Sequence, residues 1–511
     1  ISLEEAADGK RAEVHLSGFE LVRGKSAGQG GCVENHFDLT LEKSLFEGCV
    51  ATPTGAGGPS DGIGGGLLSW AGSTLHLEKV RFVENQAVVG GAVASFGTTT
   101  IEDAYFENNV AIMEGGALVL VDLEGSLEFE LLDSKFIENK ASQAGALSIR
   151  VRRIQIEEAV FKGNLATGFT GGGALRAYGE TGEEEVVIRR SRFEGNRGLG
   201  HGGAIHASKL KLLVEDTSFL ENASVPPLPD DHERAKGGAI ALVSHHGEAE
   251  EVLGSLELRR SLLRGNEASW GGGLHVDGQL TMDRCAVIEN EASVWGGGID
   301  LVHVPNGTMT NTTVARNRAL QGGGIYVHLE SEVKFHYLTV IENSATGNAD
   351  NERGRPGPVG GLAIANATVE MGRSILAKNE ATGGTTRDIW VEPDRGSSVA
   401  NFITRGDNLI GDFKGGSKLL SPIPLINPLL GDVAGDSLTG EEHVLDPGLE
   451  ELTEVFVGDL PTWIAVPRED GRALDKVASE RCTNLIFRST EDQRGKARPS
   501  GTGCDVGAAE R

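Results

Sequence analysis

The chain has 511 residues, of which 73 are glycine and only 5% are aromatic, and its formal net charge at pH 7 is −27. This charge excludes nucleic acid as a partner, because phosphate binding needs a basic surface, and no apolar run reaches the ~18 residues of a membrane span. Glycine is about twice as frequent as its usual share of roughly 7%, which favours strands joined by tight turns. The acidic charge favours solubility, cation binding or contact with basic surfaces; we predict no cofactor, with calcium as the alternative.

The N-terminal region begins with Ile1 and shows no signal-peptide pattern, so we interpret the sequence as a processed or partial chain of a secreted protein. Cys32 and Cys49 lie close together in the sequence, as do Cys482 and Cys504, and this spacing predicts two local disulfides. Disulfides indicate an oxidising compartment. The alternative is that all 5 cysteines are reduced and partly buried.

From residue 85 onward, an asparagine recurs at a nearly fixed spacing. The shortest interval, between Asn85 and Asn109, is 24 residues, and longer intervals contain insertions. The column consists of Asn85, Asn109, Asn139, Asn164, Asn196, Asn222, Asn266, Asn290, Asn317, Asn343 and Asn379. Three residues before each asparagine stands an apolar residue, which is Phe from 82 to 219 and Leu or Val from 263 to 376. Stacked coils produce such a repeated side-chain lane.

Most of these asparagines are followed by a glycine cluster and a short alternating segment such as 274–277, and this alternation predicts a strand. A repeat of about 24 residues is too short for a βαβ unit, which needs roughly 30. It fits one coil of a parallel β-helix, with glycines at the corners. The asparagines, which tolerate a left-handed backbone, would form a hydrogen-bonded ladder along the axis. Cys49 occupies an asparagine position, and Cys285 lies in a lane of small, buried residues.

The sequence therefore predicts an all-β fold, with parallel β-helix repeats over residues 1–385 and roughly fourteen coils in all. Residues 386–511 lack the regular column and carry several prolines. We interpret them as irregular terminal coils and a C-terminal cap that covers an open end of the solenoid.

The repeat motifs are similar to those of chlamydial polymorphic outer-membrane proteins. The similar segments are FVEN…GGAV (82–93), FENN…GGAL (106–118), FEGN…GGAI (193–205) and FLEN…GGAI (219–240). The resemblance covers roughly residues 20–385. It implies a right-handed β-helix, which the right-handed preference of parallel crossovers also favours.

The tail resembles the C-terminal region of bacterial choice-of-anchor Q proteins. The similar segments are GDNLIGD (406–412), DPGL (446–449), ALD (473–475), DQRGKARP (492–499) and CDVGAAE (504–510). This resemblance implies a secreted bacterial surface protein and leaves the mode of anchoring open.

The strand after each glycine cluster carries a predicted outward lane of polar residues. Its members include Arg176, His206, His275, Asp300 and Tyr326, and a second lane two residues further on includes Asp277 and His328. Strands in a stack lie about 4.8 Å apart, so the five residues between 275 and 328 should share one patch. Adjacent carboxylates and imidazoles serve acid/base catalysis or sugar binding. The alternative is a polar face that only meets solvent.

Trp270 and Trp295 precede glycine clusters in adjacent coils, and we expect them to stack at one edge, either to bind sugar rings or to cover the corner. The insertions 224–236 and 344–358 should project from the same edge, where partners bind. The sequence contains no zinc-type ligand spacing, P-loop or nucleotide fingerprint, so we predict no metal site of these kinds.

These observations predict a secreted, cell-surface or extracellular-matrix protein of a bacterium. We expect it to be structural or adhesive and non-catalytic, and to associate with itself or with surface polysaccharide or protein. The alternative is a carbohydrate-active enzyme, a polysaccharide lyase or glycoside hydrolase, that uses the His275–Asp300–Tyr326 face. A calcium-stabilised scaffold is a third hypothesis. An enzyme requires a cleft over that face, whereas a scaffold requires a flat flank.

Overall fold

The structure is a computed structural model, and its chain falls into two compact units, which are described separately. The first unit contains residues 1–235 and 239–254, and the second contains residues 236–238 and 255–511. The structure describes residues 2–3, 13–55, 61–122, 125, 127, 129–228, 235–244, 252–347, 358–382, 388–392, 400–412, 433–434, 446–478, 482, 490–499, 501 and 503–511.

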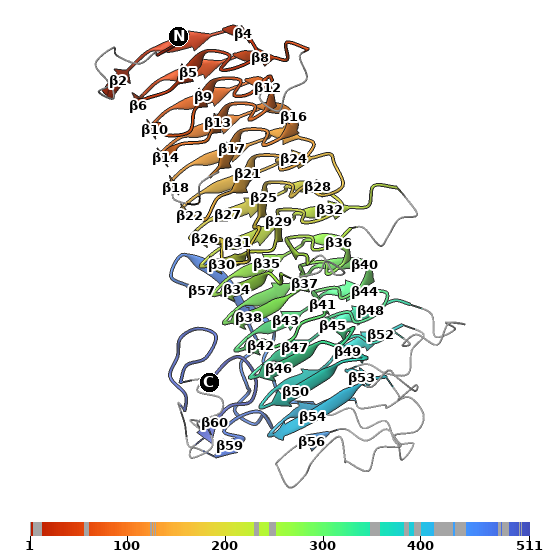
Figure 1. The fold of residues 1–511 in the computed structure, drawn as a ribbon. Helices are drawn as coiled ribbons and strands as arrows, with labels where there is room; N and C mark the ends of the chain where they lie inside the picture. The colour runs from red at the N-terminus through yellow and green to blue at the C-terminus, as the bar shows by residue number, and fades with distance from the viewer. Residues whose placement is uncertain are drawn as a thin grey trace. The chain divides into compact units, whose positions relative to one another are not determined.

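Each unit is built from coils of short strands that pair in parallel with their equivalents in the next coil (Figure 1). Each regular coil has four strands, and we call the four resulting sheets A to D in the order in which the chain enters them. In sheet C, for example, Phe82 pairs with Phe106 and Phe106 pairs with Phe136. The predicted parallel β-helix is therefore confirmed, and its right hand stays a prediction.

Sheet A follows the glycine corner and carries the predicted polar lanes. In the first unit it contains β1 (Ser2–Leu3), β5 (Val33–Asn35), β9 (Leu67–Ser69), β13 (Val93–Ser95), β17 (Leu118–Val121), β21 (Leu147–Arg150), β25 (Leu175–Tyr178), β29 (Ile205–Ser208) and β33 (Ile240–Leu242). In the second unit it contains β37 (Leu274–Asp277), β41 (Ile299–Val302), β45 (Ile325–His328), β49 (Leu362–Ala365) and β53 (Ile389–Val391).

Sheet B follows sheet A in each coil. In the first unit it contains β2 (Glu13–Ser17), β6 (Asp38–Glu42), β10 (Thr74–Glu78), β14 (Thr98–Glu102), β18 (Phe129–Leu132), β22 (Arg153–Glu157), β26 (Glu185–Arg189) and β30 (Lys211–Glu215). In the second unit it contains β34 (Ser255–Arg259), β38 (Gln279–Asp283), β42 (Gly307–Thr310), β46 (Glu332–His336), β50 (Thr368–Gly372) and β54 (Asn401–Gly406).

Sheet C carries the apolar lane that precedes the asparagines. In the first unit it contains β3 (Glu20–Val22), β7 (Leu45–Glu47), β11 (Arg81–Val83), β15 (Tyr105–Glu107), β19 (Lys135–Ile137), β23 (Val160–Lys162), β27 (Arg192–Glu194) and β31 (Ser218–Leu220). In the second unit it contains β35 (Leu262–Arg264), β39 (Ala286–Ile288), β43 (Thr313–Ala315), β47 (Thr339–Ile341), β51 (Ile375–Ala377), β55 (Leu409–Ile410) and β56 (Val433–Ala434).

Sheet D leads to the glycine corner. In the first unit it contains β4 (Lys25–Ala27), β8 (Val50–Thr52), β12 (Gln86–Val89), β16 (Val110–Glu114), β20 (Lys140–Ala141), β24 (Leu165–Ala166), β28 (Arg197–Leu199) and β32 (Ala223–Val225). In the second unit it contains β36 (Glu267–Trp270), β40 (Glu291–Trp295), β44 (Arg318–Ala319), β48 (Ser344–Ala345) and β52 (Glu380–Ala381).

The predicted asparagine ladder is present inside both units. The Nδ2 atom of Asn85 donates to Oδ1 of Asn109 at 2.9 Å, and the same contact recurs to Asn222 and again from Asn266 to Asn379. Oδ1 of Asn85 accepts from the Cys49 backbone N–H at 2.9 Å, which places Cys49 in an asparagine position as predicted. The left-handed φ of 55° belongs to Glu84, one residue before Asn85, so the predicted left-handed asparagine backbone is wrong.

The corner glycines are needed both for a left-handed backbone and for the close approach of neighbouring coils. Gly115 has a φ of 62°, in the region that favours glycine. A Cβ on the next residue, Gly116, would lie 2.0 Å from the carbonyl oxygen of Gly145 in the neighbouring coil. The coils therefore approach each other too closely at this corner for any side chain.

Both predicted disulfides are present, Cys32–Cys49 and Cys482–Cys504, and Cys285 is free and fully buried. Burial raises the pKa of the Cys285 thiol to about 12, so this thiol stays protonated at neutral pH. No helix among the described residues has the length and apolar character needed to cross a membrane.

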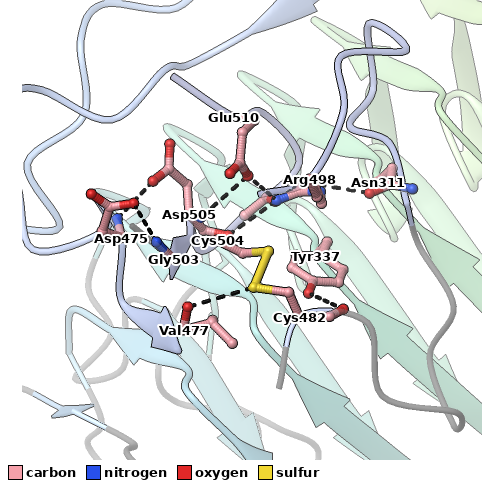
Figure 2. Close-up of a disulfide and its surroundings, with 11 residues drawn as sticks. Asn311, Tyr337, Asp475, Val477, Cys482, Arg498, Gly503, Cys504, Asp505 and Glu510 are labelled. Atoms are coloured by element: carbon pink, nitrogen blue, oxygen red, sulfur yellow. Dashed lines mark hydrogen bonds and ion pairs between the residues drawn. A yellow bond between two sulfur atoms is a disulfide. The ribbon is translucent and has the colours of Figure 1, made fainter. Parts of the chain in front are cut away.

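The described residues of 446–511, which we call the C-terminal segment, lie along the flank of sheet C in the second unit. This segment contains two antiparallel pairs, β57 (Thr453–Val457) with β58 (Leu460–Ile464) and β59 (Val477–Ala478) with β60 (Gly503–Cys504). Arg498 forms a fully buried ion pair with Glu510 at 2.8 Å and stacks over the Tyr337 ring (Figure 2).

These lateral contacts differ from the predicted role of this segment as a cover for an open end. Gln493 Nε2 donates to the Cys285 carbonyl at 2.8 Å, and the Ala508 N–H donates to Thr339 Oγ1 at 2.9 Å. The described C-terminal residues therefore cover the side of several coils. The predicted division of the chain at residue 385 stays a prediction.

Candidate functional site

The predicted patch between residues 275 and 328 exists in the second unit, but it is not a solvent face. The register places His275 of β37 beside Asp300 of β41, and Asp300 beside Tyr326 of β45. His275 and Asp300 are both 0% exposed, and Asp277, Tyr326 and His328 are buried as well. The prediction that these side chains share a patch is confirmed, and the prediction that they face solvent is wrong.

Asp300 lies at the centre of a hydrogen-bonded network. Its Oδ2 atom is 2.8 Å from His275 Nδ1, and its Oδ1 atom is 3.0 Å from His328 Nε2. Burial alone would raise the pKa of Asp300, but the charge of His328 and the hydrogen bonds from both histidines hold this pKa well below its usual range. Burial lowers the pKa of His275 and favours the neutral imidazole. His275 Nε2 has no hydrogen-bond partner among the described residues.

Two tryptophans from sheet D explain the burial of this network. The rings of Trp270 and Trp295 lie 4.8 Å apart, which confirms their predicted proximity at the glycine corner. Trp295 is 5.5 Å from the Tyr326 ring and 5.5 Å from the His328 ring, while Trp270 is 6.4 Å from His275. Trp295 also packs against an apolar cluster that contains Tyr326. The tryptophans thus cover the corner, and their sugar-binding role stays a prediction.

The remaining predicted residues, Arg176 and His206, lie in the first unit, on neighbouring strands β25 and β29. Arg176 Nη1 contacts Glu114 Oε1 at 3.4 Å, and Arg150 Nη2 donates to Glu114 Oε2 at 2.9 Å. His206 Nδ1 is 2.8 Å from the Thr170 carbonyl oxygen, and His206 is only 5% exposed.

Glu114 and Arg150 are functional candidates that the sequence prediction missed. Glu114 ends β16, directly before Gly115, whereas Arg150 ends β21 in the second outward lane. Arg150 could have been found by following the second outward lane back to the coil that precedes Arg176, whereas Glu114 lies in sheet D, outside these lanes. The side chains of Arg176 and Glu114 remain 16% and 15% exposed, so solvent reaches this cluster.

A polar groove on sheet B of the second unit was also missed. It has a volume of about 130 Å³, and its polar lining residues are Asn306, Thr308, Glu332, Lys334, Thr368 and Glu370. Arg405 binds both oxygens of Glu370 at 2.7 and 2.8 Å and lowers the pKa of this carboxyl. The sequence carries no motif that separates these residues from an ordinary polar strand face.

Metal and partner predictions have limited support in this structure. Within the described ranges there is no group of three or more His, Cys, Asp or Glu side chains arranged to hold a metal ion. Calcium binding stays a prediction. Insertions 224–236 and 344–358 lie partly outside the described residues, which omit 229–234 and 348–357.

Comparison with known proteins supports part of the predicted family resemblance. Residues 190–208 match the Chlamydia polymorphic membrane protein (Chlamydia_PMP) repeat. Metabotropic glutamate receptor-like protein R of Dictyostelium discoideum is 28% identical over 180 residues, an alignment that covers 31% of this chain and 11% of the relative. The chain thus matches about a tenth of that relative's length. No solved structure matches the chain. The match at 190–208 agrees with the predicted polymorphic membrane protein repeats, and the choice-of-anchor Q resemblance stays a prediction.

Proposed function

We propose that this protein is a non-catalytic β-helical scaffold on the surface of a bacterium, or secreted by one, and that its outer faces bind a ligand. The observation that carries this proposal is the burial of His275 and Asp300, which are both 0% exposed. The two carboxylate oxygens of Asp300 are each hydrogen-bonded to a histidine, so this acid/base group has no free oxygen for a substrate.

Two further observations support the surface location. The repeat match at 190–208 is to a polymorphic membrane protein family, and the two disulfides favour an oxidising compartment. Labelling intact cells with a membrane-impermeant amine reagent tests the location. We expect exposed lysines such as Lys135 to be modified, and protection of these lysines until the cells are lysed would contradict surface exposure.

A panel of acidic and neutral polysaccharides, incubated with the full chain, tests the absence of catalysis. We expect no new reducing ends and no unsaturated uronates. We expect Asp300→Asn to lower the stability of the protein without changing polysaccharide binding, because Asp300 organises a buried network. Cleavage that Asp300→Asn abolishes would instead support the enzyme hypothesis.

The carbohydrate-active enzyme remains the second candidate, and the groove on sheet B is the observation that favours it. Glu332 and Lys334 line this groove, and β46 presents both side chains to solvent. Glu370 is held ionised by Arg405, so it is unsuited to act as a general acid. Cleavage that Glu332→Gln abolishes, and that survives in Asp300→Asn, would place an active site in this groove.

A further inference from the structure

We propose that sheet A of the first unit binds the carboxylate or sulfate groups of an acidic polysaccharide, at a cluster formed by Arg150, Arg176 and Glu114. This inference rests on the proposed function as a ligand-binding scaffold and names the class of its ligand. We call these three residues the Arg–Glu–Arg cluster.

The geometry of neighbouring coils brings the Arg–Glu–Arg cluster together. Arg176 of β25 pairs in register with Ser148 of β21, two residues before Arg150. Glu114 approaches from the end of β16 in sheet D and accepts hydrogen bonds from Ser148 Oγ and from Arg150. Glu114 is thereby fixed in place, and Arg176 contacts it only at 3.4 Å.

The charge of the cluster is unbalanced. Two guanidinium groups share one carboxylate, which leaves one excess positive charge on a chain whose net charge is −27. Arg176 Nε is buried and has no hydrogen-bond partner among the described residues. Burial also lowers the pKa of Arg176, so its environment penalises the uncompensated cation. A second anion would supply the missing charge and accept from the guanidinium edge.

The surroundings favour a sugar chain as the carrier of that anion. The Tyr178 ring lies 6.0 Å from Arg176 Cζ on the same strand. Phe169 is 55% exposed, and the carbonyl of its neighbour Thr170 contacts His206 in the strand next to Arg176. Aromatic rings with a polar edge or an open face suit sugar rings. Strands about 4.8 Å apart would let a polymer contact several coils at once.

The equivalent lane of the second unit lacks these properties. There, His275 and Asp300 occupy the lane, and each is the other's hydrogen-bond partner. Both side chains are 0% exposed, whereas that of Arg176, in the same lane, is 16% exposed and that of Arg150, in the second lane, is 49% exposed. Of these two clusters, the Arg–Glu–Arg cluster is the one that a ligand can reach.

Calorimetric titration of the full chain tests the proposal, with heparin, polygalacturonate, neutral dextran, poly-glutamate and inorganic sulfate as probes. We expect heparin or polygalacturonate to bind, and dextran not to bind. The double variant Arg150→Gln/Arg176→Gln should weaken binding at least about tenfold, because it removes charge-assisted hydrogen bonds. The matched control is Arg192→Gln, which removes an exposed arginine of sheet C in the same unit and should change affinity less than about twofold.

Glu114→Gln provides a result that misfolding cannot imitate. It removes the competing negative charge while keeping an acceptor for Ser148, so we expect tighter polysaccharide binding. Equal binding by the wild type and the double arginine variant would overturn the proposal, as would equal weakening by Arg192→Gln. Failure of both acidic polysaccharides to bind, or binding of poly-glutamate or sulfate as tightly as the better polysaccharide, would also overturn it.

The same samples are assayed for polymer cleavage, which separates the two proposals. Cleavage would contradict the non-catalytic scaffold. The effect of Arg150→Gln/Arg176→Gln on affinity would still test the binding proposal by itself. Absence of cleavage together with loss of binding in Arg150→Gln/Arg176→Gln supports both.

Discussion

The first residue of each sheet C strand from β3 to β55 points away from the core, and we call this row of side chains the outer lane of sheet C. It differs sharply between the two units. In the first unit, Arg81 of β11 and Arg192 of β27 project into solvent. At the same strand position in the second unit, Ala286 of β39 is 0% exposed and Thr339 of β47 is 1% exposed. The C-terminal segment covers the lane in the second unit, because Gln493 and Ala508 hydrogen-bond to its coils.

We call the buried asparagines, and the apolar residues three positions before them, the inner lanes. The difference shows that inner and outer lanes are subject to separate physical constraints. The inner lane must stack on its own copy in the next coil, so asparagine follows asparagine in both units. An outer lane is free to carry charge where solvent covers it, but it must be small or apolar where another segment packs on it. A run of small outer residues therefore indicates a covered flank, and a charged run indicates an open one.

The largest effects should come from the shared inner lane. Asn139 donates to the Phe106 carbonyl and to Asn164, and it accepts from Asn109. We expect Asn139→Ala to lower the free energy of unfolding by about 3–6 kcal/mol, because several buried polar groups lose their partners. Urea denaturation followed by hydrogen exchange measures the loss in each unit.

The equivalent change in the second unit, Asn317→Ala, should have a similar cost, since Asn317 makes the same contacts with Val287, Asn343 and Asn290. Lys140→Ala, at an exposed neighbour of Asn139, is the control and should shift stability by about 0.5 kcal/mol or less. A large difference between Asn139→Ala and Asn317→Ala would contradict a common inner lane.

The next effect should be confined to the covered flank of the second unit. Arg498→Met leaves Glu510 buried without its ionic partner, and we expect a loss of about 3–5 kcal/mol. Hydrogen exchange should rise in β39, β43 and β47 and stay unchanged in the first unit.

Two variants make the Arg498 experiment decisive. The double variant Arg498→Met/Glu510→Leu should recover most of the loss, because it removes both buried charges. Arg192→Met, which breaks an exposed pair with Glu194, should cost about 1 kcal/mol or less. A cost for Arg498→Met no greater than that for Arg192→Met would show that the C-terminal segment does not depend on this ion pair.

The inner lanes are also the part of the fold that the sequence predicts best. Phe106 and Asn109 recur at one offset because each must meet its own kind in the next coil, so the repeat itself reveals the stack. The period does not reveal that Glu84 rather than Asn85 takes the left-handed backbone, since both positions recur with the same spacing.

The candidate sites were harder to predict, because burial of an outer lane depends on neighbouring segments. Alternation correctly grouped His275 with Asp300, but it could not show that Trp270 and Trp295 close over them. Likewise, Glu114 reaches Arg176 across a sheet corner, although the two residues are 62 positions apart in the sequence. A lane analysis within one sheet misses such a contact.

A smaller effect should follow from exchanging inner-lane residues between the units. Phe136 stacks on Phe106 and Phe161 at 4.7 Å, whereas the equivalent lane of the second unit holds Val314. Phe136→Val should lower stability by about 2–3 kcal/mol, because it leaves a cavity in the stack. The reverse change, Val314→Phe, should cost about 1–3 kcal/mol by overpacking. Thermal denaturation measures both, and a stabilising Val314→Phe would show unfilled space in the second unit.

The smallest expected effect is a pH dependence at the end of the second unit's asparagine ladder. Asn379 donates to Asp388 Oδ1 at 2.7 Å, so a carboxyl group takes the place of the next amide. Burial raises the pKa of Asp388 to about 7. A raised folded-state pKa gives stability that is present below the unfolded value of about 3.9 and is lost as pH rises through about 7. The contribution of Asp388 alone should be a loss of about 1.4 kcal/mol between pH 6 and pH 8.

His275 and Asp300 contribute the opposite slope, and the contribution of His275 offsets part of the Asp388 loss between pH 6 and pH 7. Both folded-state pKa values are lowered, so their contributions are present above the unfolded values of about 6.5 and 3.9 and are lost as pH falls. Asp388→Asn should abolish the loss between pH 6 and pH 8 while leaving the acidic loss intact. Its baseline stability should fall by about 1–3 kcal/mol, because the Asp412 N–H loses its acceptor. An unchanged slope in Asp388→Asn would mean that another group titrates there. The ladder of the second unit would then end without a titrating group, just as the ladder of the first unit begins with the Cys49 backbone N–H.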